Sequence, residues 1–261
     1  MNPQTKPAVI EMQDATVCAL RDVTLPVAEH INWRVGLGEF WVVAGRQQTG
    51  KSDLLLTAAG LLPPLAGTCR LLGLDTRAFG EAEPAERLRV GLVFANDRLF
   101  GHMTLGENIA LPLRYQRNLT APEAEHEIRD LLELLELTPF AEAAPANVSR
   151  DWLRRAALAR ALVLQPEVLL CDHPLGGLSP RHRQWWPDFL DQLGRGHKAL
   201  GGRPVTVVVT TEELSPWQHP DRRYALLRDK QFLPLGSWAE LAGTDDPVLK
   251  ELLAAPPANP L

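Results

Sequence analysis

Residues 38–52 read "GEFWVVAGRQQTGKS", and this stretch decides the fold of the chain. "GEFWVVAG" (38–45) is an apolar run that ends in glycine, which predicts a buried strand. "GRQQTGKS" (45–52) fits the pattern G-x-x-x-x-G-K-[ST]. "KSDLLLTAAGLL" (51–62) follows with the apolar spacing of a helix, and "PPLAG" ends it. Strand, loop and helix in this order predict a loop that binds phosphate.

The residue types in this loop indicate its chemistry. Glycines let the backbone curl until its N–H groups face phosphate oxygens, and the next helix adds the positive end of its dipole. Lys51 would reach the β- and γ-phosphates of a nucleotide, and the Ser52 hydroxyl would bind Mg²⁺. We therefore expect ATP to contact the residues of this loop: Gly45, Arg46, Gln47, Gln48, Thr49, Gly50, Lys51 and Ser52.

A second apolar run, "EVLLCD" (167–172), predicts a buried strand that ends in an acid. In proteins with a phosphate loop, a neighbouring strand carries an aspartate that holds Mg²⁺, which makes Asp172 the second candidate metal ligand. The alternative is an acid that caps the next turn. The phosphate loop favours the metal ligand.

Apolar strands alternate with helices along most of the chain. This alternation predicts an α/β fold with a parallel sheet covered on both faces. Residues 9–35 alternate apolar and polar, which predicts an antiparallel β part at the N-terminus. A helix-rich insert at 96–151, with an amphipathic helix at 123–137, predicts a subdomain. The remaining predicted strands are 89–97 and 204–211, and the remaining predicted helices are 151–164 and 181–193.

Composition excludes several classes of protein. The 261 residues are 45% hydrophobic, enough for a sizeable core, and the net charge of -5 argues against a nucleic-acid partner. No run of about 18 apolar residues occurs, so we expect no membrane span. The cysteines are far apart and form no C-x-x-C pair, which predicts buried, reduced thiols: Cys18, Cys69 and Cys171.

Several stretches together resemble the nucleotide-binding subunits of ABC transporters. "GRQQTGKSDLLLTAAGLLPPLAG" looks like the family's phosphate loop and its helix, and "GLVFANDRLFGHMTLGENIALPL" (91–113) looks like the segment around its Q-loop. "RRAALARALVLQPEVLLCDHPLGGLSP" (154–180) is similar to the helix after the signature motif, the Walker B strand and the D-loop. The resemblance covers residues 9–240. "LFGHMTLGENIALPLRY" and "RRAALARALVLQPE" look most like the ATPase of Mla-type phospholipid-trafficking systems.

The resemblance implies a single P-loop NTPase domain with a RecA-like core at 1–95 and 152–245, a helical subdomain at 96–151 and a C-terminal tail at 246–261. It also implies a head-to-tail dimer with a second ABC ATPase chain, the same or different, with MgATP bound between the two chains. An integral membrane permease would be the other partner. The chain would then be cytoplasmic, on the inner face of the cell membrane.

Several positions depart from the pattern of the family. The Q-loop glutamine falls on Ala95, with Asn96 adjacent but one residue out of phase. The signature LSGGQ falls on "VSRDW" (148–152). Ser149 is kept there, both glycines become Arg150 and Asp151, and the glutamine position holds Trp152.

Three further departures concern the chemistry of hydrolysis. The family's general base, a glutamate, falls on His173, the D-loop aspartate on Ser179 and the switch histidine on Thr211. General acid–base assistance is worth about 10²–10⁴-fold. We therefore expect MgATP binding with slow turnover, or binding without hydrolysis by a pseudo-ATPase. His173 is either a substitute base or a residue tolerated because no base is needed. An unrelated P-loop kinase is disfavoured because "ALARAL" and "LLCDHPLGGLSP" have no place in one.

Overall fold

The computed structural model describes residues 6–78 and 88–254, and the contacts within it divide the chain into two units. Unit 1 contains Met1–Arg87 and Thr206–Leu261, and unit 2 contains Leu88–Val205. The predicted division into a RecA-like core (1–95 and 152–245) and a helical subdomain (96–151) stays a prediction.

Unit 1 is built on strands that pair in the order β5-β4-β1-β2-β10-β9-β3-β8. The pairs β1–β2, β1–β4, β4–β5 and β9–β10 are antiparallel, and β3 lies parallel to both β8 and β9. The strands are β1 (Ala8–Ala19), β2 (Asp22–Gly36), β3 (Phe40–Ala44), β4 (Ala66–Leu71), β5 (Leu74–Asp75), β8 (Thr206–Thr211), β9 (Arg223–Arg228) and β10 (Gln231–Gly236).

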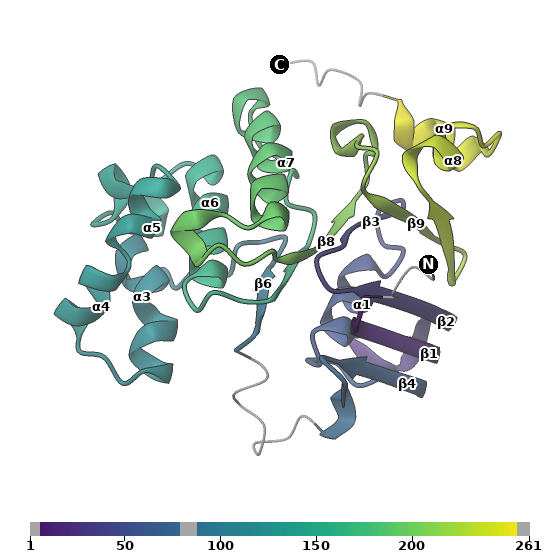
Figure 1. Cartoon of the computed structure of the whole chain (residues 1–261), viewed down its shortest axis with the longest axis horizontal. Coiled ribbons are helices and arrows are strands. Elements are labelled where there is room, and N and C mark those ends of the chain that lie inside the picture. The colour runs from purple at the N-terminus through teal and green to yellow at the C-terminus, as the bar shows by residue number, and fades with distance from the viewer. Residues whose placement is uncertain (1–5, 79–87, 255–261) are drawn as a thin grey trace. The chain divides into compact units, whose positions relative to one another are not determined.

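The N-terminal strands form the predicted antiparallel part, and Figure 1 shows β1, β2 and β4 side by side. Met12 on β1 lies opposite Trp33 on β2, and both side chains are buried. The Trp33 ring meets the Trp41 ring edge to face at 5.9 Å. These tryptophans therefore pack in the core of unit 1.

The parallel strands β3 and β8 of unit 1 are buried along their whole length, as expected for strands covered on both faces. Val42 on β3 pairs with Val209 on β8 and with Tyr224 on β9. α1 (Lys51–Ala58) contacts β1, β4 and β8, whereas α8 (Trp238–Ala242) contacts β9 and β10.

One sequence expectation about a helix end in unit 1 is corrected. α1 ends at Ala58 instead of Leu62, because the chain turns back there: Gly60 has φ 70° and its N–H donates to the Thr57 carbonyl. The expected tail at 246–261 begins with a helix, α9 (Pro247–Leu253), which Asp246 caps by accepting hydrogen bonds from Val248 and Leu249. Residues 255–261 lie outside the described part.

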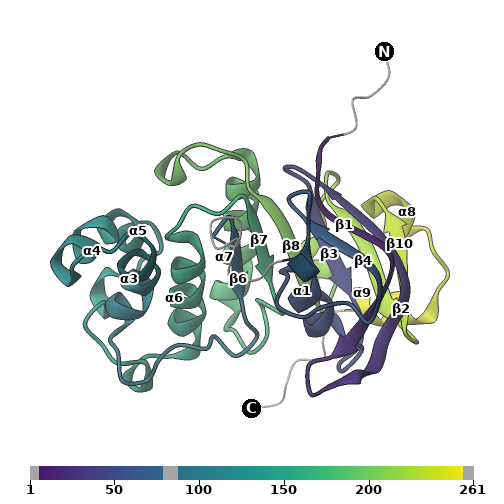
Figure 2. The ribbon, with the colours of Figure 1, turned by 90° about the horizontal axis from the view of Figure 1, so that it is seen from below.

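Unit 2 contains the parallel strands β6 (Val90–Val93) and β7 (Val168–Cys171), paired with Leu92 opposite Leu170. α6 packs on β6 and on α3, and Figure 2 shows α3, α4, α5 and α6 grouped together. The helices are α3 (Leu105–Gln116), α4 (Ala121–Glu127), α5 (Arg129–Leu134), α6 (Arg150–Leu162) and α7 (Pro180–Arg195). Short 3-10 helices in the two units span Thr76–Ala78, Thr138–Phe140, Pro145–Asn147, Lys198–Leu200 and Ser215–Trp217.

The helix predicted at 123–137 is two helices, α4 and α5, which meet at Ile128. The break is slight, because Ile128 still donates to the Ala124 carbonyl and Leu132 to the Ile128 carbonyl. The end of α5 at Leu134 departs more clearly from the predicted helix. Glu136 has φ 58°, outside the right-handed helical region, so the prediction was wrong for the last residues of this helix.

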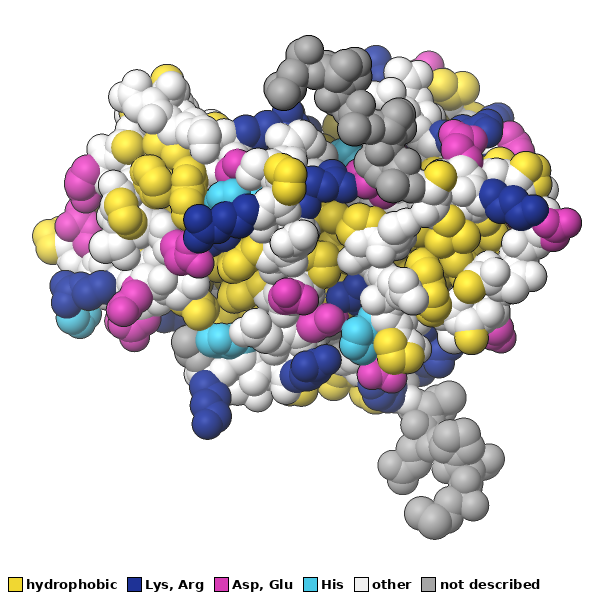
Figure 3. All heavy atoms as spheres, turned by 90° about the horizontal axis from the view of Figure 1, so that it is seen from above, with side chains coloured by type: hydrophobic (Ala, Val, Ile, Leu, Met, Phe, Trp, Pro, Cys, Tyr) yellow, Lys and Arg dark blue, Asp and Glu magenta, His cyan; other side chains and the backbone are white. Residues whose placement is uncertain are grey.

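The cysteines agree with the expectation of buried thiols. Cys18, Cys69 and Cys171 are buried and free, and burial raises the pKa of the Cys69 thiol to about 12. On the face in Figure 3, Lys and Arg side chains are interspersed with Asp and Glu side chains. Across residues 6–78 and 88–254, no helix combines the length and the apolar character that a membrane crossing requires.

Candidate functional site

The predicted phosphate loop connects β3 directly to α1 in unit 1. The Gly45 N–H donates to the Thr211 carbonyl of β8 at 3.2 Å. A Cβ at position 45 would lie 2.5 Å from the Leu227 carbonyl oxygen and 2.8 Å from Thr49 Oγ1, so only glycine fits there. Gly50 caps α1 with φ 92°, a conformation that glycine adopts without strain. Both glycines of the motif are therefore required by the backbone.

Lys51 lies at the centre of this loop. Its side chain is only 7% exposed, and Nζ donates to the carbonyls of Gly45 at 2.8 Å and Arg46 at 2.6 Å. Glu212, just after β8, has a carboxylate oxygen 3.9 Å from Nζ. The ammonium thus lies among main-chain oxygens of the loop, within reach of a phosphate that the loop would bind.

The neighbouring residues fit a nucleotide with its metal. Ser52 is exposed in the first turn of α1, and its hydroxyl is the hard oxygen donor that Mg²⁺ prefers. Gln47 and Gln48 are also exposed, and Gln48 has φ 64°. The Thr49 hydroxyl donates to the Arg46 carbonyl at 3.0 Å. The structure therefore gathers all eight predicted residues in one loop.

Thr211 ends β8 directly beside the phosphate loop, opposite Ala44 of β3. Its hydroxyl donates to the Glu213 carbonyl at 2.8 Å and accepts hydrogen bonds from Glu213 N and from Trp217 Nε1. The side chain at the switch position is thus held within its own turn, and threonine has no imidazole to offer a phosphate.

In unit 2, β7 delivers Asp172 and His173 at its carboxyl end. Asp172 donates its N–H to the Val93 carbonyl of β6 at 2.8 Å, and the residue is 8% exposed. Its carboxylate oxygens are the kind of ligand that Mg²⁺ takes. His173 has φ 46°, in the left-handed region. A Cβ at Gly176 would lie 2.5 Å from His173 Nε2, so the imidazole packs against the Gly176 backbone.

Arg154 connects the two loops that follow β6 and β7. Its guanidinium is fully buried and donates to the carbonyls of Ala95, at 2.6 Å, and His173, at 3.0 Å. It also forms an ion pair with Asp97. Burial lowers the pKa of Arg154, although the negative charge of Asp97 opposes this shift. Burial likewise raises the pKa of Asp97, although the positive charges of Arg154, Arg150 and Arg160 oppose that shift.

Arg154 was missed by the sequence interpretation, although one signal was present. It lies on the same stripe of α6 as Leu158 and Leu162, at positions i, i+4 and i+8, and these residues are buried. An arginine on an apolar stripe has to find buried acceptors. Asn96, the adjacent alternative to Ala95, is exposed.

The residues at the signature position are engaged within unit 2. Ser149 is the N-cap of α6. A Cβ at Gly177 would lie 2.9 Å from Arg150 Nη1, so the guanidinium lies over the loop after β7. Asp151 Oδ1 accepts the Ser179 N–H at 2.9 Å. The N-terminal turn of α6 therefore contacts the loop in which Ser179 stands.

Trp152 belongs to an aromatic cluster between α6 and α7. Its ring is 4.9 Å from that of Phe140 and meets the His182 imidazole edge to face at 4.8 Å. The Arg155 guanidinium lies 4.8 Å from the Trp152 ring and 3.9 Å from the Trp185 ring. The structure therefore gives Trp152 a packing role.

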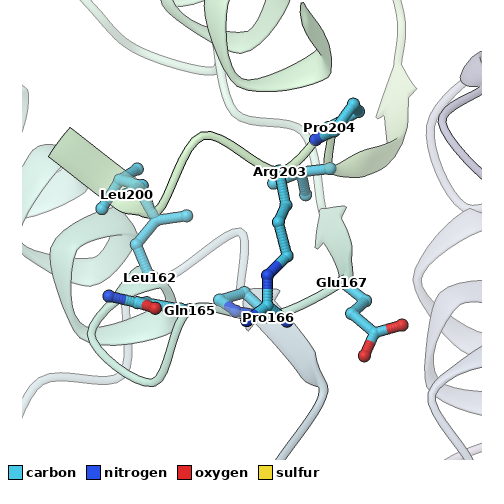
Figure 4. A pocket seen from close by; sticks show the side chains of 8 residues that line it. Leu162, Gln165, Pro166, Glu167, Leu200, Arg203 and Pro204 are labelled. Carbon is cyan, nitrogen blue, oxygen red and sulfur yellow. The ribbon is translucent and has the colours of Figure 1, made fainter. Parts of the chain in front are cut away.

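A pocket in unit 2 lies at the amino ends of β6 and β7, opposite to the ends that carry Asp172 and His173. Gln165, Glu167 and Arg203 are its polar lining residues, among apolar neighbours (Figure 4). Glu167 forms a two-bond ion pair with Arg89, at 2.8 and 2.9 Å. Because the pocket lies at the opposite strand ends, it is separate from the site that contains Asp172 and His173.

Comparisons with known proteins agree with this geometry. The profile of the family described as "ABC transporter" matches residues 28–176. The spermidine/putrescine import ATP-binding protein of Thermobifida fusca is 33% identical over 222 residues, which cover 85% of this chain and 55% of that protein. The probable sulfate/thiosulfate import ATP-binding protein of Chlorella vulgaris is 31% identical over 214 residues, 82% of this chain and 86% of that protein.

Solved structures agree at the level of the fold. An ATP-binding cassette determined as a dimer in a post-hydrolysis state, bound to ADP and Pi, matches with a TM-score of 0.73 and 24% identity. The match covers 85% of this chain and 95% of that one. The predicted α/β fold is thereby confirmed. The chain spans about half the length of the first curated relatives it matches, 55%, 52% and 52%.

Proposed function

The chain belongs to the ABC transporter family, and we propose that it is the nucleotide-binding subunit of a membrane transport complex. In this proposal it binds MgATP at the phosphate loop and hydrolyses it slowly. A second ABC ATPase chain and an integral membrane permease are its partners. The protein then lies in the cytoplasm, on the inner face of the membrane.

The observation that carries the proposal is the position of Lys51 inside an intact phosphate loop. Its ammonium group donates to two loop carbonyls, and nucleotide phosphates would replace these acceptors. Ser52 and Asp172 would hold the metal, and bound Mg²⁺ would neutralise charge on the β- and γ-phosphates. The residues of the loop would hold the nucleotide itself.

Slow hydrolysis is proposed from the residues that stand at the catalytic positions of the family. His173, at the position of the base, is packed against Gly176, and Ala95 offers only its carbonyl, to Arg154. Arg150 and Asp151 stand where the family has glycines, and both contact the loop after β7. Thr211 directs its hydroxyl to its own turn. In the family the replaced polar side chains position water or phosphate, and the glycines let backbone N–H groups approach phosphate, so these changes weaken that positioning.

Calorimetric titration of MgATP into the purified protein tests the proposal. The wild-type protein should bind, and Lys51→Ala should lose at least about tenfold in affinity, because a charge-assisted contact to phosphate is removed. Lys230→Ala is the control, since Lys230 pairs with Glu29 on the surface of unit 1. A wild-type protein without nucleotide binding, or a Lys51→Ala variant that binds equally well, would contradict the proposal.

A second candidate function is a pseudo-ATPase that binds nucleotide and regulates a membrane complex without hydrolysis. The engagement of Arg150 and Asp151 within their own unit favours it. Phosphate-release assays, with and without the membrane partner, separate the two functions. Release above the Lys51→Ala background supports the slow ATPase, and release equal to that background supports the pseudo-ATPase.

Three further predictions remain within this proposal. The helical subdomain at 96–151 would contact the permease. The dimer would be formed with the same or a different ATPase chain. The resemblance to Mla-type phospholipid-trafficking ATPases stays a prediction and names no substrate.

A further inference from the structure

We propose that Glu251, on the C-terminal helix α9, lowers the affinity of the phosphate loop for nucleotide by neutralising Arg46. The inference rests on the proposed nucleotide binding and identifies Glu251 as a residue that modulates the affinity for nucleotide. Glu251 lies outside the sequence motif by about two hundred residues, so the motif gives no hint of it.

The contact between the two side chains is direct. Arg46 donates from Nε at 3.1 Å and from Nη2 at 2.5 Å, and both hydrogen bonds go to the same oxygen, Glu251 Oε2. The Arg46 carbonyl in turn accepts a hydrogen bond from Lys51 Nζ at 2.6 Å. Glu251 therefore binds the side chain of Arg46, whose main-chain carbonyl accepts the hydrogen bond of the Lys51 ammonium.

The position of Glu251 is fixed by the packing of α9 within unit 1. Leu249 and Leu252 are buried, and the Leu252 carbonyl accepts the Leu214 N–H at 2.7 Å. Asp246, which caps the helix, forms an ion pair at 2.6 Å with Arg228 of β9. α9 is thus anchored at both ends.

The Arg46–Glu251 pair is suited to exchange with a phosphate. Its side chains are 59% and 55% exposed, and ion pairs this exposed contribute only about 0–1 kcal/mol. A guanidinium binds phosphate with two parallel hydrogen bonds, so a nucleotide can compete for Arg46. Until it does, Glu251 cancels the positive charge of Arg46. The nearby carboxylate of Asp229 acts on Arg46 in the same direction but less strongly.

Nucleotide affinity in five proteins tests this inference: the wild type, Glu251→Gln, Asp245→Asn, Arg46→Gln and the double variant Arg46→Gln/Glu251→Gln. Asp245→Asn is the matched control, because it removes the same charge beside α9, from a carboxylate paired with Lys250. Calorimetry with ATP, ADP and AMP is run at low and at high ionic strength.

Glu251→Gln should bind ATP about fivefold more tightly at low salt, because it frees the positive charge of Arg46 to act through solvent on a polyanion. The gain should shrink above about 0.5 M salt, where the Debye length is only a few ångströms. It should be smaller for ADP and smallest for AMP, which carry less charge. In the Arg46→Gln background, the Glu251→Gln change should give no gain.

Unchanged or weaker ATP binding by Glu251→Gln would overturn the inference. An equal gain in Asp245→Asn, or a full gain without Arg46, would overturn it as well. These results are distinct from failure of the proposed function, in which the wild-type protein itself binds no nucleotide and Lys51→Ala changes nothing.

Discussion

The guanidinium of Arg154 donates a hydrogen bond to the main-chain carbonyl of His173 at 3.0 Å, from a side chain that is fully buried. A second hydrogen bond, at 2.6 Å, reaches the carbonyl of Ala95. One arginine thus joins the two positions at which the resemblance places the Q-loop glutamine and the general base. Both positions contribute their backbones to this contact.

Arg154→Met should destabilise the protein by about 3–5 kcal/mol, because it removes the guanidinium that pairs with the buried carboxylate of Asp97. Arg154→Lys should lose less free energy of unfolding than Arg154→Met, since an ammonium restores the charge but not all the hydrogen bonds. Urea unfolding measures both variants. Arg114→Ala, an exposed change on α3, is the control and should remain within about 0.5 kcal/mol of the wild type. Equal effects of Arg154→Met and Arg114→Ala would refute the role of the buried guanidinium.

Gly45→Ala should weaken nucleotide binding, because the added Cβ would lie 2.5 Å from the Leu227 carbonyl and displace the first residue of the loop. Such overpacking costs about 1–3 kcal/mol. Gly101→Ala is the matched control, since its added Cβ would meet no atom within 4 Å. Calorimetry with MgATP compares them. If Gly45→Ala binds like the wild type, the described loop geometry is wrong.

The stability of the fold should fall as the pH drops below about 6.5, the ordinary pKa of histidine. Burial lowers the pKa of His182, and Arg155 and Arg181 act in the same direction against Asp151 and Glu136. Below that pH the unfolded chain takes up the proton before the folded one, so the stability that the neutral side chain contributes is lost.

Urea unfolding at about pH 7.5 and 5.5, values on either side of that pKa, checks this sign. His182→Gln should flatten the dependence on pH, whereas His126→Gln, at an exposed position on α4, should leave it unchanged. A dependence on pH that is equally steep in His182→Gln would show that another group is responsible.

His173→Glu restores the residue type of the family but should raise turnover by less than about tenfold, below the 10²–10⁴ typical of acid–base assistance. The reason is that Ala95 and Thr211 would still lack the side chains that position water and phosphate. The left-handed φ of 46° is also less favourable for glutamate than for histidine. Phosphate release measures the change, with His173→Gln as control. A gain of about a hundredfold would show that the missing base alone limits hydrolysis.

The strand, loop and helix around residues 45–52 are predictable from the sequence because their signals are local. One short stretch holds a buried strand, the glycines at 45 and 50 and a following helix. The backbone requires both glycines. The buried strands β7 and β8 were also predicted nearly to the residue, since continuous apolar runs leave few alternatives.

Contacts between distant residues could not be predicted in the same way. Neither the ion pair of Arg46 with Glu251 nor the contacts of Arg154 have a local pattern, because tertiary packing alone brings these side chains together. The prediction of helix ends was wrong for a related reason. α1 stops at a turn made by Gly60, although the apolar spacing of the sequence continues to Leu62.

Single-turnover analysis of radiolabelled MgATP, mixed with excess wild-type protein, tests the central claim most directly. We expect MgATP to bind at the phosphate loop and Lys51→Ala to bind it at least about tenfold more weakly. Most of the bound nucleotide should still be ATP after about a minute, a time by which enzymes turning over at about 1–10³ per second have finished. Conversion to ADP within about a second, lost in His173→Ala, would contradict the account.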